Sequence, residues 1–219
     1  MSVGANIARV RESIGTKPVT LIAVTKQATI TQIEEAFSAG VTEFGENRLQ
    51  SALAKMEELA PEIQQRSRWH FIGHLQTNKV KQVIGNFELI HSVDSVHLAE
   101  QLSKTAKERG VRQAILLQVK VAEDPSKFGF SPDQLKTSFK QLRSLDNLLI
   151  KGLMTITPLD CTRETSIKCF DGVRELRDQL AKEYEMELRE LSMGMSDDWQ
   201  DAVACGATMI RLGRAIFGN

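Results

Sequence analysis

The sequence predicts an α/β protein folded as a single (β/α)8 barrel of the TIM type, with an extra helix at its N-terminus. Eight short apolar segments alternate with segments of helical periodicity along the 219 residues, a pattern typical of parallel βα units. Connections are mostly short and no linker, repeat or low-complexity stretch divides the chain, so we expect one domain over residues 1–219. An open doubly wound sheet is the alternative, but no G-x-G-x-x-G follows the first strand and no G-x-x-x-x-G-K-[ST] occurs.

The predicted strands are runs of apolar and β-branched residues, as in parallel sheets whose strands are buried on both faces. The first is the clearest, because every residue from Val19 to Thr25 is apolar or β-branched and Lys26 ends the run. The expected strands are residues 19–26, 41–44, 69–73, 87–93, 114–119, 148–154, 187–191 and 208–212.

The predicted helices carry apolar residues spaced three and four apart and have recognisable start and stop residues. Thr29 with Gln32, and Ser131 with Gln134, form capping-box patterns at two helix starts. Glycines such as Gly40 follow several helix ends. Further cap candidates are Asn47, Asp94, Ser95 and residues 196–198. The helices are expected at residues 5–14, 30–37 and 49–59, through 80–83 and 98–102, from 131 onward, at 167–180, and through 202–204.

The composition is that of an ordinary globular protein without a strong electrostatic field. Hydrophobic residues make up 42% and charged residues 26%, and 28 basic residues balance 28 acidic ones. A net charge of zero gives no general attraction to nucleic acid or to an anionic membrane, and no apolar run approaches the length of a membrane span. The three cysteines show no C-x-x-C spacing, so we expect inert thiols in a reducing cytoplasm.

Chemically distinctive residues recur just after the predicted strand ends. Residues from many strands that meet at one rim are typical of an active or cofactor site in a barrel. Each residue also has an ordinary structural explanation, such as a lysine that reaches solvent as its strand surfaces. The set comprises Lys26, Asn47, His74, Ser92, Met154, the run Ser192-Met193-Gly194-Met195-Ser196, and the run Arg211-Leu212-Gly213-Arg214.

The last two strand ends favour a phosphorylated ligand. Loops after strands seven and eight of a barrel often bind phosphate through backbone N–H groups and a helix start, and the turn at Gly213 and Arg214 fits this pattern. An amine with a lowered pKa can attack a carbonyl, and Lys26 is such a candidate. Pyridoxal phosphate carries both an aldehyde and a phosphate, and its pyridine nitrogen takes a charged protein partner, for which Arg211 is a candidate. Arg211 is also explained by pairing with a carboxylate.

Several motifs resemble the pyridoxal phosphate homeostasis protein family over nearly the whole chain and in the same order. The blocks are Ala23-Val24-Thr25-Lys26, Phe44-Gly45-Glu46-Asn47-Arg48, Trp69 to Lys79, Gly152-Leu153-Met154, Leu191 to Trp199, and Ile210 to Gly218. The resemblance implies a barrel of the alanine racemase N-terminal type that carries pyridoxal phosphate as a Schiff base on Lys26. It also implies that Arg211 faces the pyridine nitrogen and that Asn47 lies beside the ring.

By the same resemblance, the phosphate is held by the backbone around Gly213 and Arg214 together with the loop from Ser192 to Ser196. Which of the two serines supplies a hydroxyl stays open. His74, Ser92, Met154, Met193 and Gly194 complete the set of expected cofactor-binding residues.

The sequence favours a cofactor carrier over an enzyme. Racemases that resemble this barrel use a tyrosine from an additional β domain as a second base, whereas the only tyrosine here is Tyr184, and Phe217 stands where the racemase-like pattern has tyrosine. The resemblance implies a role in intracellular pyridoxal phosphate homeostasis and in amino-acid and keto-acid balance, without established catalysis. The alternative is a racemase or related enzyme of low activity.

The expected partners are pyridoxal phosphate itself and, beyond it, apo-enzymes that need this cofactor or a regulatory protein, with the chain a monomer. Two other interpretations are weaker. His70 and His74 are the only histidines close in sequence, which is too few for a metal site. The basic cluster around Lys79 and Lys81 reads as a solvated helix face rather than a nucleic-acid contact.

Overall fold

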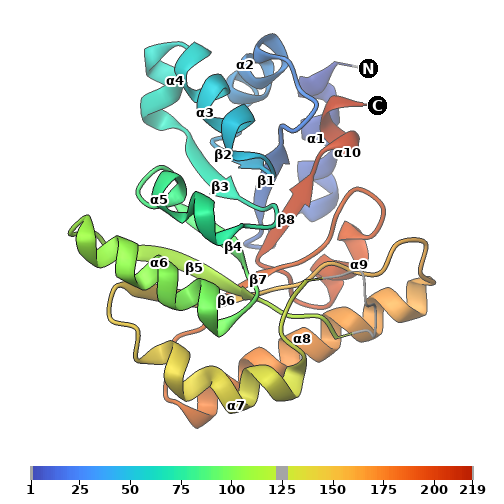
Figure 1. Ribbon diagram of the computed structural model, residues 1–219. Helices are drawn as coiled ribbons and strands as arrows, with labels where there is room; N and C mark the ends of the chain where they lie inside the picture. The colour runs from blue at the N-terminus through green and yellow to red at the C-terminus, as the bar shows by residue number, and fades with distance from the viewer. Residues whose placement is uncertain (1, 122–127, 219) are drawn as a thin grey trace.

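The computed structural model describes residues 2–121 and 128–218 (Figure 1). Eight parallel strands form a closed barrel in chain order, with β8 pairing back onto β1. The strands are β1 (Thr20–Val24), β2 (Glu43–Glu46), β3 (Arg68–Phe71), β4 (Leu89–Val93), β5 (Gln113–Gln118), β6 (Leu148–Met154), β7 (Glu190–Ser192) and β8 (Met209–Leu212). The predicted (β/α)8 barrel is confirmed.

Helices surround the barrel, and an extra helix, α1, precedes the first strand as predicted (Figure 1). Both capping boxes form, since the Thr29 and Ser131 side chains each accept from the backbone N–H three residues on. The helices are α1 (Val3–Ile14), α2 (Ile30–Ser38), α3 (Leu49–Glu58), α4 (Pro61–Arg66), the 3-10 helix η1 (Thr77–Lys79), α5 (Val80–Val83), α6 (Val96–Glu108), α7 (Pro132–Arg143), α8 (Arg163–Glu183), α9 (Trp199–Ala204) and α10 (Arg214–Phe217). No described helix is long and apolar enough to cross a membrane.

Several local expectations need correction. Gly45 and Glu46 belong to β2, which was expected to end at residue 44, because the strand continues past Phe44 to pair with β3. Strand β7 is shorter and later than expected. The helices α4 and α10 were not expected from the periodicity, since each has only four to six residues. Asn47 does not cap α3; Arg48 holds that position, without a side-chain cap bond.

The apolar core lies mainly between the strands and the helices, and burying each large side chain there stabilises the fold by about 1.5–3 kcal/mol. Phe44 and Trp69, for example, pack with ring centroids 5.4 Å apart. A second, smaller cluster contains the buried side chains of Leu89, Leu116 and Met154. It lies on strands β4 to β6, and the polar side chains described below occupy the interior beside it.

Candidate functional site

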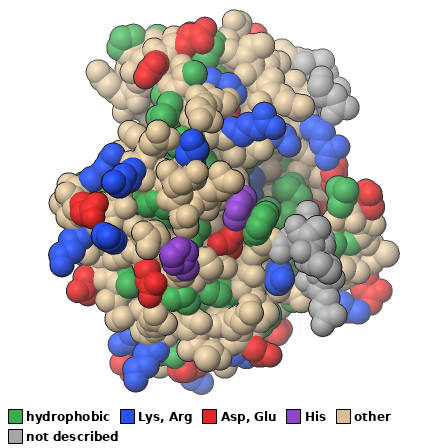
Figure 2. Space-filling view, viewed as in Figure 1, with side chains coloured by type: hydrophobic (Ala, Val, Ile, Leu, Met, Phe, Trp, Pro, Cys, Tyr) green, Lys and Arg blue, Asp and Glu red, His purple; other side chains and the backbone are tan. Residues whose placement is uncertain are grey.

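A cavity of about 200 Å³ opens among the carboxyl ends of the strands. Its wall combines an amine, a guanidinium, a hydroxyl, a carboxamide and apolar side chains, and Figure 2 shows a hollow on the molecular face bordered by basic, histidine and hydrophobic side chains. The lining residues are Val24, Lys26, Asn47, Ile72, Ile156, Met195, Ser196, Arg211, Gly213 and Arg214. Six of them, Lys26, Asn47, Ser196, Arg211, Gly213 and Arg214, were predicted from the sequence.

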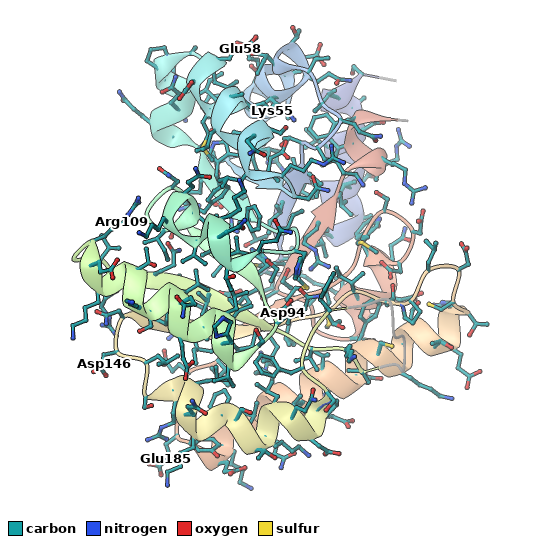
Figure 3. All side chains as sticks on the ribbon, viewed as in Figure 1. Lys55, Glu58, Asp94, Arg109, Asp146 and Glu185 are labelled. Atoms are coloured by element: carbon teal, nitrogen blue, oxygen red, sulfur yellow. The ribbon has the colours of Figure 1, made fainter. Side chains whose placement is uncertain are left out.

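Lys26 lies on the loop that follows β1, and a buried ion pair fixes the chain just before it. Lys55, labelled on α3 in Figure 3, donates to Glu46 Oε1 at 2.6 Å and to the backbone carbonyl of Thr25. The Thr25 hydroxyl donates to the same Glu46 oxygen at 2.8 Å. Glu46 is fully buried, so this pair is shielded from solvent. The Lys26 side chain itself is exposed and lines the cavity.

Arg211 places a buried positive charge on the wall of the cavity. Its side chain extends from β8 and donates to Ser192 Oγ at 2.6 Å and to the Thr155 carbonyl at 2.9 Å. The structure records no ion pair for Arg211 among the described residues, so the alternative in which a carboxylate neutralises it by direct contact is not observed. Burial lowers the pKa of Arg211 to about 10, and Asp198 opposes that effect only through space.

The loops after β7 and β8 supply further polar groups of the cavity. Gly213 precedes the short helix α10, whose first backbone N–H groups have no acceptor within the helix. Ser196 Oγ accepts from the Ala215 N–H at 3.1 Å, which joins the loop after β7 to the loop after β8. Arg214 pairs with Asp197 at the rim. Of the two serines in the loop after β7, Ser196 lines the cavity, whereas Ser192 contacts Arg211.

The other predicted residues do not line this cavity. His74 lies outside the cavity lining, with Nδ1 3.1 Å from Oδ2 of Asp94 and its ring stacked on Phe128 with ring centroids 3.7 Å apart. Asp94 is labelled in Figure 3. The remaining members are buried. The Ser92 hydroxyl has no hydrogen-bond partner among the described residues, and Ser192 contacts Arg211. Met154 belongs to the small apolar cluster, Met193 to the main core, and Gly194 lies against Trp199 and Ala202. For these residues, direct contact with a ligand stays a prediction.

Sequence reasoning missed the apolar walls of the cavity and its supports. Ile72 and Ile156 line it but read as ordinary core residues in the sequence, and Met195 was named only as part of the run from Ser192 to Ser196. Glu46 could have been found as a supporting residue, because it is a carboxylate within a block of buried residues. Lys55 could not, because it lies on a helix whose sequence looks exposed. The helical periodicity that locates α3 does not reveal which of its polar residues turns inward.

A chain of polar side chains extends from Arg211 through the interior. His91 Nδ1 lies 2.8 Å from Ser192 Oγ, and its Nε2 lies 2.9 Å from His70 Nδ1. His70 Nε2 in turn lies 2.7 Å from Glu43 Oε2. Strands β4 and β7 are not neighbours in the barrel, so the contact between His91 and Ser192 must cross the interior. His70 therefore does not join His74 at the rim, and no metal-binding group of three or more His, Cys, Asp or Glu occurs among the described residues.

We expect His91 to make the protein sensitive to mild acid. Burial, together with His70 and Arg211, holds the pKa of His91 well below its ordinary value. In the unfolded chain, the His91 side chain takes up a proton as pH falls through about 6.5. In the folded protein the same side chain stays neutral. Stability is lost with decreasing pH in that window, by about 1.4 kcal/mol per pH unit.

Urea unfolding of wild type and His91→Asn between pH 5 and 7 measures this effect. The variant should show a flatter pH dependence, by close to one proton, whatever its stability at pH 7. His97→Asn is the matched control because His97 is exposed, and it should keep the wild-type slope. Equal slopes for wild type and His91→Asn would contradict the prediction.

Comparison with known proteins places this arrangement in a family. The model of the alanine racemase N-terminal domain matches residues 2–219. A Synechocystis protein named pyridoxal phosphate homeostasis protein is 44% identical over 210 residues, 95% of each chain. The structure of PipY from Synechococcus elongatus with PLP bound superposes with a TM-score of 0.92 at 40% identity, covering 99% of this chain and all of that one.

A more distant structure shows the extent of the shared fold. Alanine racemase from Corynebacterium glutamicum superposes with a TM-score of 0.77 at 16% identity, and the match covers 99% of this chain but 60% of the racemase. This likeness concerns the barrel fold alone. The family match and the close relatives agree with the motif resemblance in the sequence, and the chain therefore belongs to the alanine racemase N-terminal domain family and, within it, to the pyridoxal phosphate homeostasis proteins.

Proposed function

We propose that this protein binds pyridoxal 5'-phosphate in the cavity, holds it as a Schiff base on Lys26, and serves as a carrier in cytoplasmic pyridoxal phosphate homeostasis. The observation that carries the proposal is that one cavity is lined by an exposed lysine, by a buried arginine without an ion pair among the described residues, and by Gly213 and Arg214 at the start of α10. The relatives named for this homeostasis and the PLP-bound PipY structure support it.

The chemical groups around the cavity fit the parts of pyridoxal phosphate. Lys26 Nζ can condense with the aldehyde, with loss of water, and Ser196 and the start of α10 suit the phosphate. Val24, Ile72 and Ile156 offer apolar contact to a ring, with Asn47 at its edge. The bound cofactor would supply a reactive aldehyde and an aromatic ring that withdraws electrons.

Arg211 makes any turnover depend on a second, well-placed base. A guanidinium has donors only, so when it faces the pyridine nitrogen it keeps that nitrogen an unprotonated acceptor. An unprotonated ring is a weaker electron sink, which disfavours abstraction of a substrate proton. Lys26 then serves mainly to hold the aldehyde reversibly, since an imine can exchange with another amine, including one on an apo-enzyme.

The alternative of a weak racemase lacks a second base. Tyr184, the only tyrosine in the sequence, follows α8 and packs on Phe139 with ring centroids 4.9 Å apart. It does not line the cavity. Incubation of the loaded protein with L-alanine in deuterated water tests this alternative. Deuterium at the α-carbon together with D-alanine would establish a racemase, and neither product is expected.

The test of cofactor binding is an absorption spectrum followed by chemical trapping. Protein mixed with pyridoxal phosphate should develop a visible band, and borohydride should fix one cofactor to the peptide that contains Lys26. Lys17, an exposed lysine before β1, is the internal control and should stay unmodified at one equivalent of cofactor. A colourless protein, or labelling spread over surface lysines, would refute the proposal.

Gly73 sets the position of Asn47, and we expect Gly73→Ala to weaken cofactor binding about tenfold, or about 1.4 kcal/mol. A Cβ at residue 73 would lie 2.1 Å from the Asn47 carbonyl oxygen, so the backbone carrying Asn47 must move. Equilibrium titration measures the dissociation constant.

Gly110→Ala is the control for a general loss of stability. Gly110 has a φ of +66° and no heavy atom within 4 Å of the added Cβ, so the variant should lose about 1 kcal/mol of stability and bind normally. Unchanged affinity in Gly73→Ala would show that Asn47 does not contribute to the site.

A further inference from the structure

The polar chain behind Arg211 has a built-in direction. Its members are nearly or fully buried, with exposed fractions of 9% for Glu43, 2% for His70, 0% for His91 and Ser192, and 4% for Arg211. Barrel interiors are usually filled by branched apolar side chains. A buried polar network stabilises a protein only when its members are satisfied, so the placement of each proton in this one can be deduced.

The two ends of the chain are fixed. Arg211 can only donate, so Ser192 Oγ accepts its hydrogen bond. At the other end, burial acts to raise the pKa of Glu43, but hydrogen bonds from His70 and Arg68 outweigh it, and the net pKa lies below its ordinary value. Glu43 is therefore an ionised carboxylate that only accepts, and His70 Nε2 must carry a proton.

The middle of the chain follows from these ends. If the Ser192 hydroxyl donates to His91 Nδ1, His91 Nε2 donates to His70 Nδ1, and His70 Nε2 donates to Glu43, every group is satisfied with two neutral imidazoles. The reverse order requires a charged His70 and a proton on His91 Nδ1. Ser192 would then accept twice, and its own proton would have no recorded acceptor among the described residues.

We propose that Glu43, His70, His91 and Ser192 are positioning residues that act as one directional relay, holding Arg211 in place from the amino end of the barrel. Both imidazoles are Nε2–H tautomers, and each hydrogen bond runs from Arg211 toward Glu43. The relay ends at a second cavity of about 420 Å³, which Glu43, Arg68, His70 and Glu88 help to line at the opposite mouth. The charge state of Glu43 is thus connected to Arg211 in the cofactor cavity through four hydrogen bonds.

The charged groups near the relay explain why it points this way. At the amino end, Arg68 pairs with Glu43, and Glu88 lies close enough to act on Arg68. In the middle, the charged or titratable groups among the described residues that act on His91 are His70 and Arg211. At the carboxyl end, Asp198 acts on Arg211 through space. The negative pole is therefore Glu43 and the positive pole Arg211.

The first test uses the unliganded wild-type protein, so its outcome does not depend on the proposed function. With four histidines in the chain, long-range ¹H–¹⁵N spectra of histidine-labelled protein resolve each ring, and His74→Gln and His97→Gln assign the two exposed ones. We expect His70 and His91 both to carry a proton on Nε2 alone at pH 7.5. A proton on His91 Nδ1 would overturn the relay.

The second test rests on the proposed function and measures the dissociation constant of pyridoxal phosphate. Ser192→Ala breaks the relay beside Arg211, and Glu43→Gln removes its ionised end. We expect each variant to bind about fivefold more weakly and the double variant to bind no more weakly than Ser192→Ala alone, because both break one unit.

Glu88→Gln is the matched control, since it removes the same charge from the same mouth but lies outside the relay. It should leave both the dissociation constant and the tautomers unchanged. If the double variant binds pyridoxal phosphate more weakly than Ser192→Ala by the factor that Glu43→Gln shows alone, the two residues act independently and the coupling between Glu43 and Arg211 is overturned. Normal binding by Glu43→Gln would also overturn it. If the wild-type protein fails to bind pyridoxal phosphate at all, the proposed function fails while the tautomer result still decides the relay.

Discussion

Lys26→Ala should abolish covalent attachment of pyridoxal phosphate without disturbing the fold. The visible band and the borohydride-stable adduct should both disappear, because Lys26 is the one lysine that lines the cavity among the residues the structure describes. Residual binding through Arg211, Ser196 and the start of α10 should persist at least about tenfold more weakly, which corresponds to about 1.4 kcal/mol. Since the Lys26 side chain is exposed, the free energy of unfolding should change by less than about 0.5 kcal/mol.

The measurement combines spectral titration with urea unfolding, and Lys26→Arg supplies a matched variant that keeps the positive charge. Lys26→Arg should retain more phosphate affinity than Lys26→Ala yet form no adduct, because a guanidinium does not condense with the aldehyde under these conditions. An adduct that survives in either variant would place the Schiff base on another amine and would remove the central element of the proposed function.

The sequence is informative about the barrel because each strand is buried on both faces. Apolar runs bounded by glycine and capping residues locate all eight strands to within a few residues, and parallel strands bring their carboxyl ends to one rim. That geometry alone brings Lys26 and Arg211 to one cavity although 185 positions separate them in the chain. Resemblance to a family added the ligand, which periodicity does not specify.

The interior relay could not be predicted, for a reason visible in β4. The register between β4 and β5 shifts between Ile90 and Val93, so simple alternation of faces does not tell which way His91 and Ser92 point. Ser92 looked suitable for a site at a strand end, yet its hydroxyl is buried without a partner. His91, which looked unremarkable in the sequence, forms the centre of the polar chain.

Glu43 and Glu46 illustrate the same limit on one strand. Both are carboxylates on β2, three positions apart, so they point to opposite faces. Glu43 meets His70 in the interior, and Glu46 meets Lys55 of the helix layer. Their partners come from other elements, and only the closed structure decides that one carboxylate supports Arg211 and the other supports the chain before Lys26.

We expect Arg211→Met to raise the stability of the unliganded protein while weakening cofactor binding. A pKa lowered to about 10 means that burial makes the charged guanidinium unfavourable in the folded state by about 3 kcal/mol. Methionine removes that burden and fills the space, although Ser192 and the Thr155 carbonyl each lose a donor. The net gain should be about 1–2 kcal/mol.

Urea unfolding of the unliganded proteins measures their stability, and a titration measures the dissociation constant of pyridoxal phosphate. Together they show whether Arg211 is kept for ligand binding or for the stability of the fold. Arg211→Lys is the comparison, because it keeps a charge but loses the two-pronged hydrogen bonding, and it should be less stable than wild type as well as weaker in binding. If Arg211→Met instead destabilises the protein by more than about 1 kcal/mol, Arg211 is needed for folding. A gain in stability together with weaker binding would show that the buried charge is kept at a cost to the fold, as expected of a residue that serves a ligand.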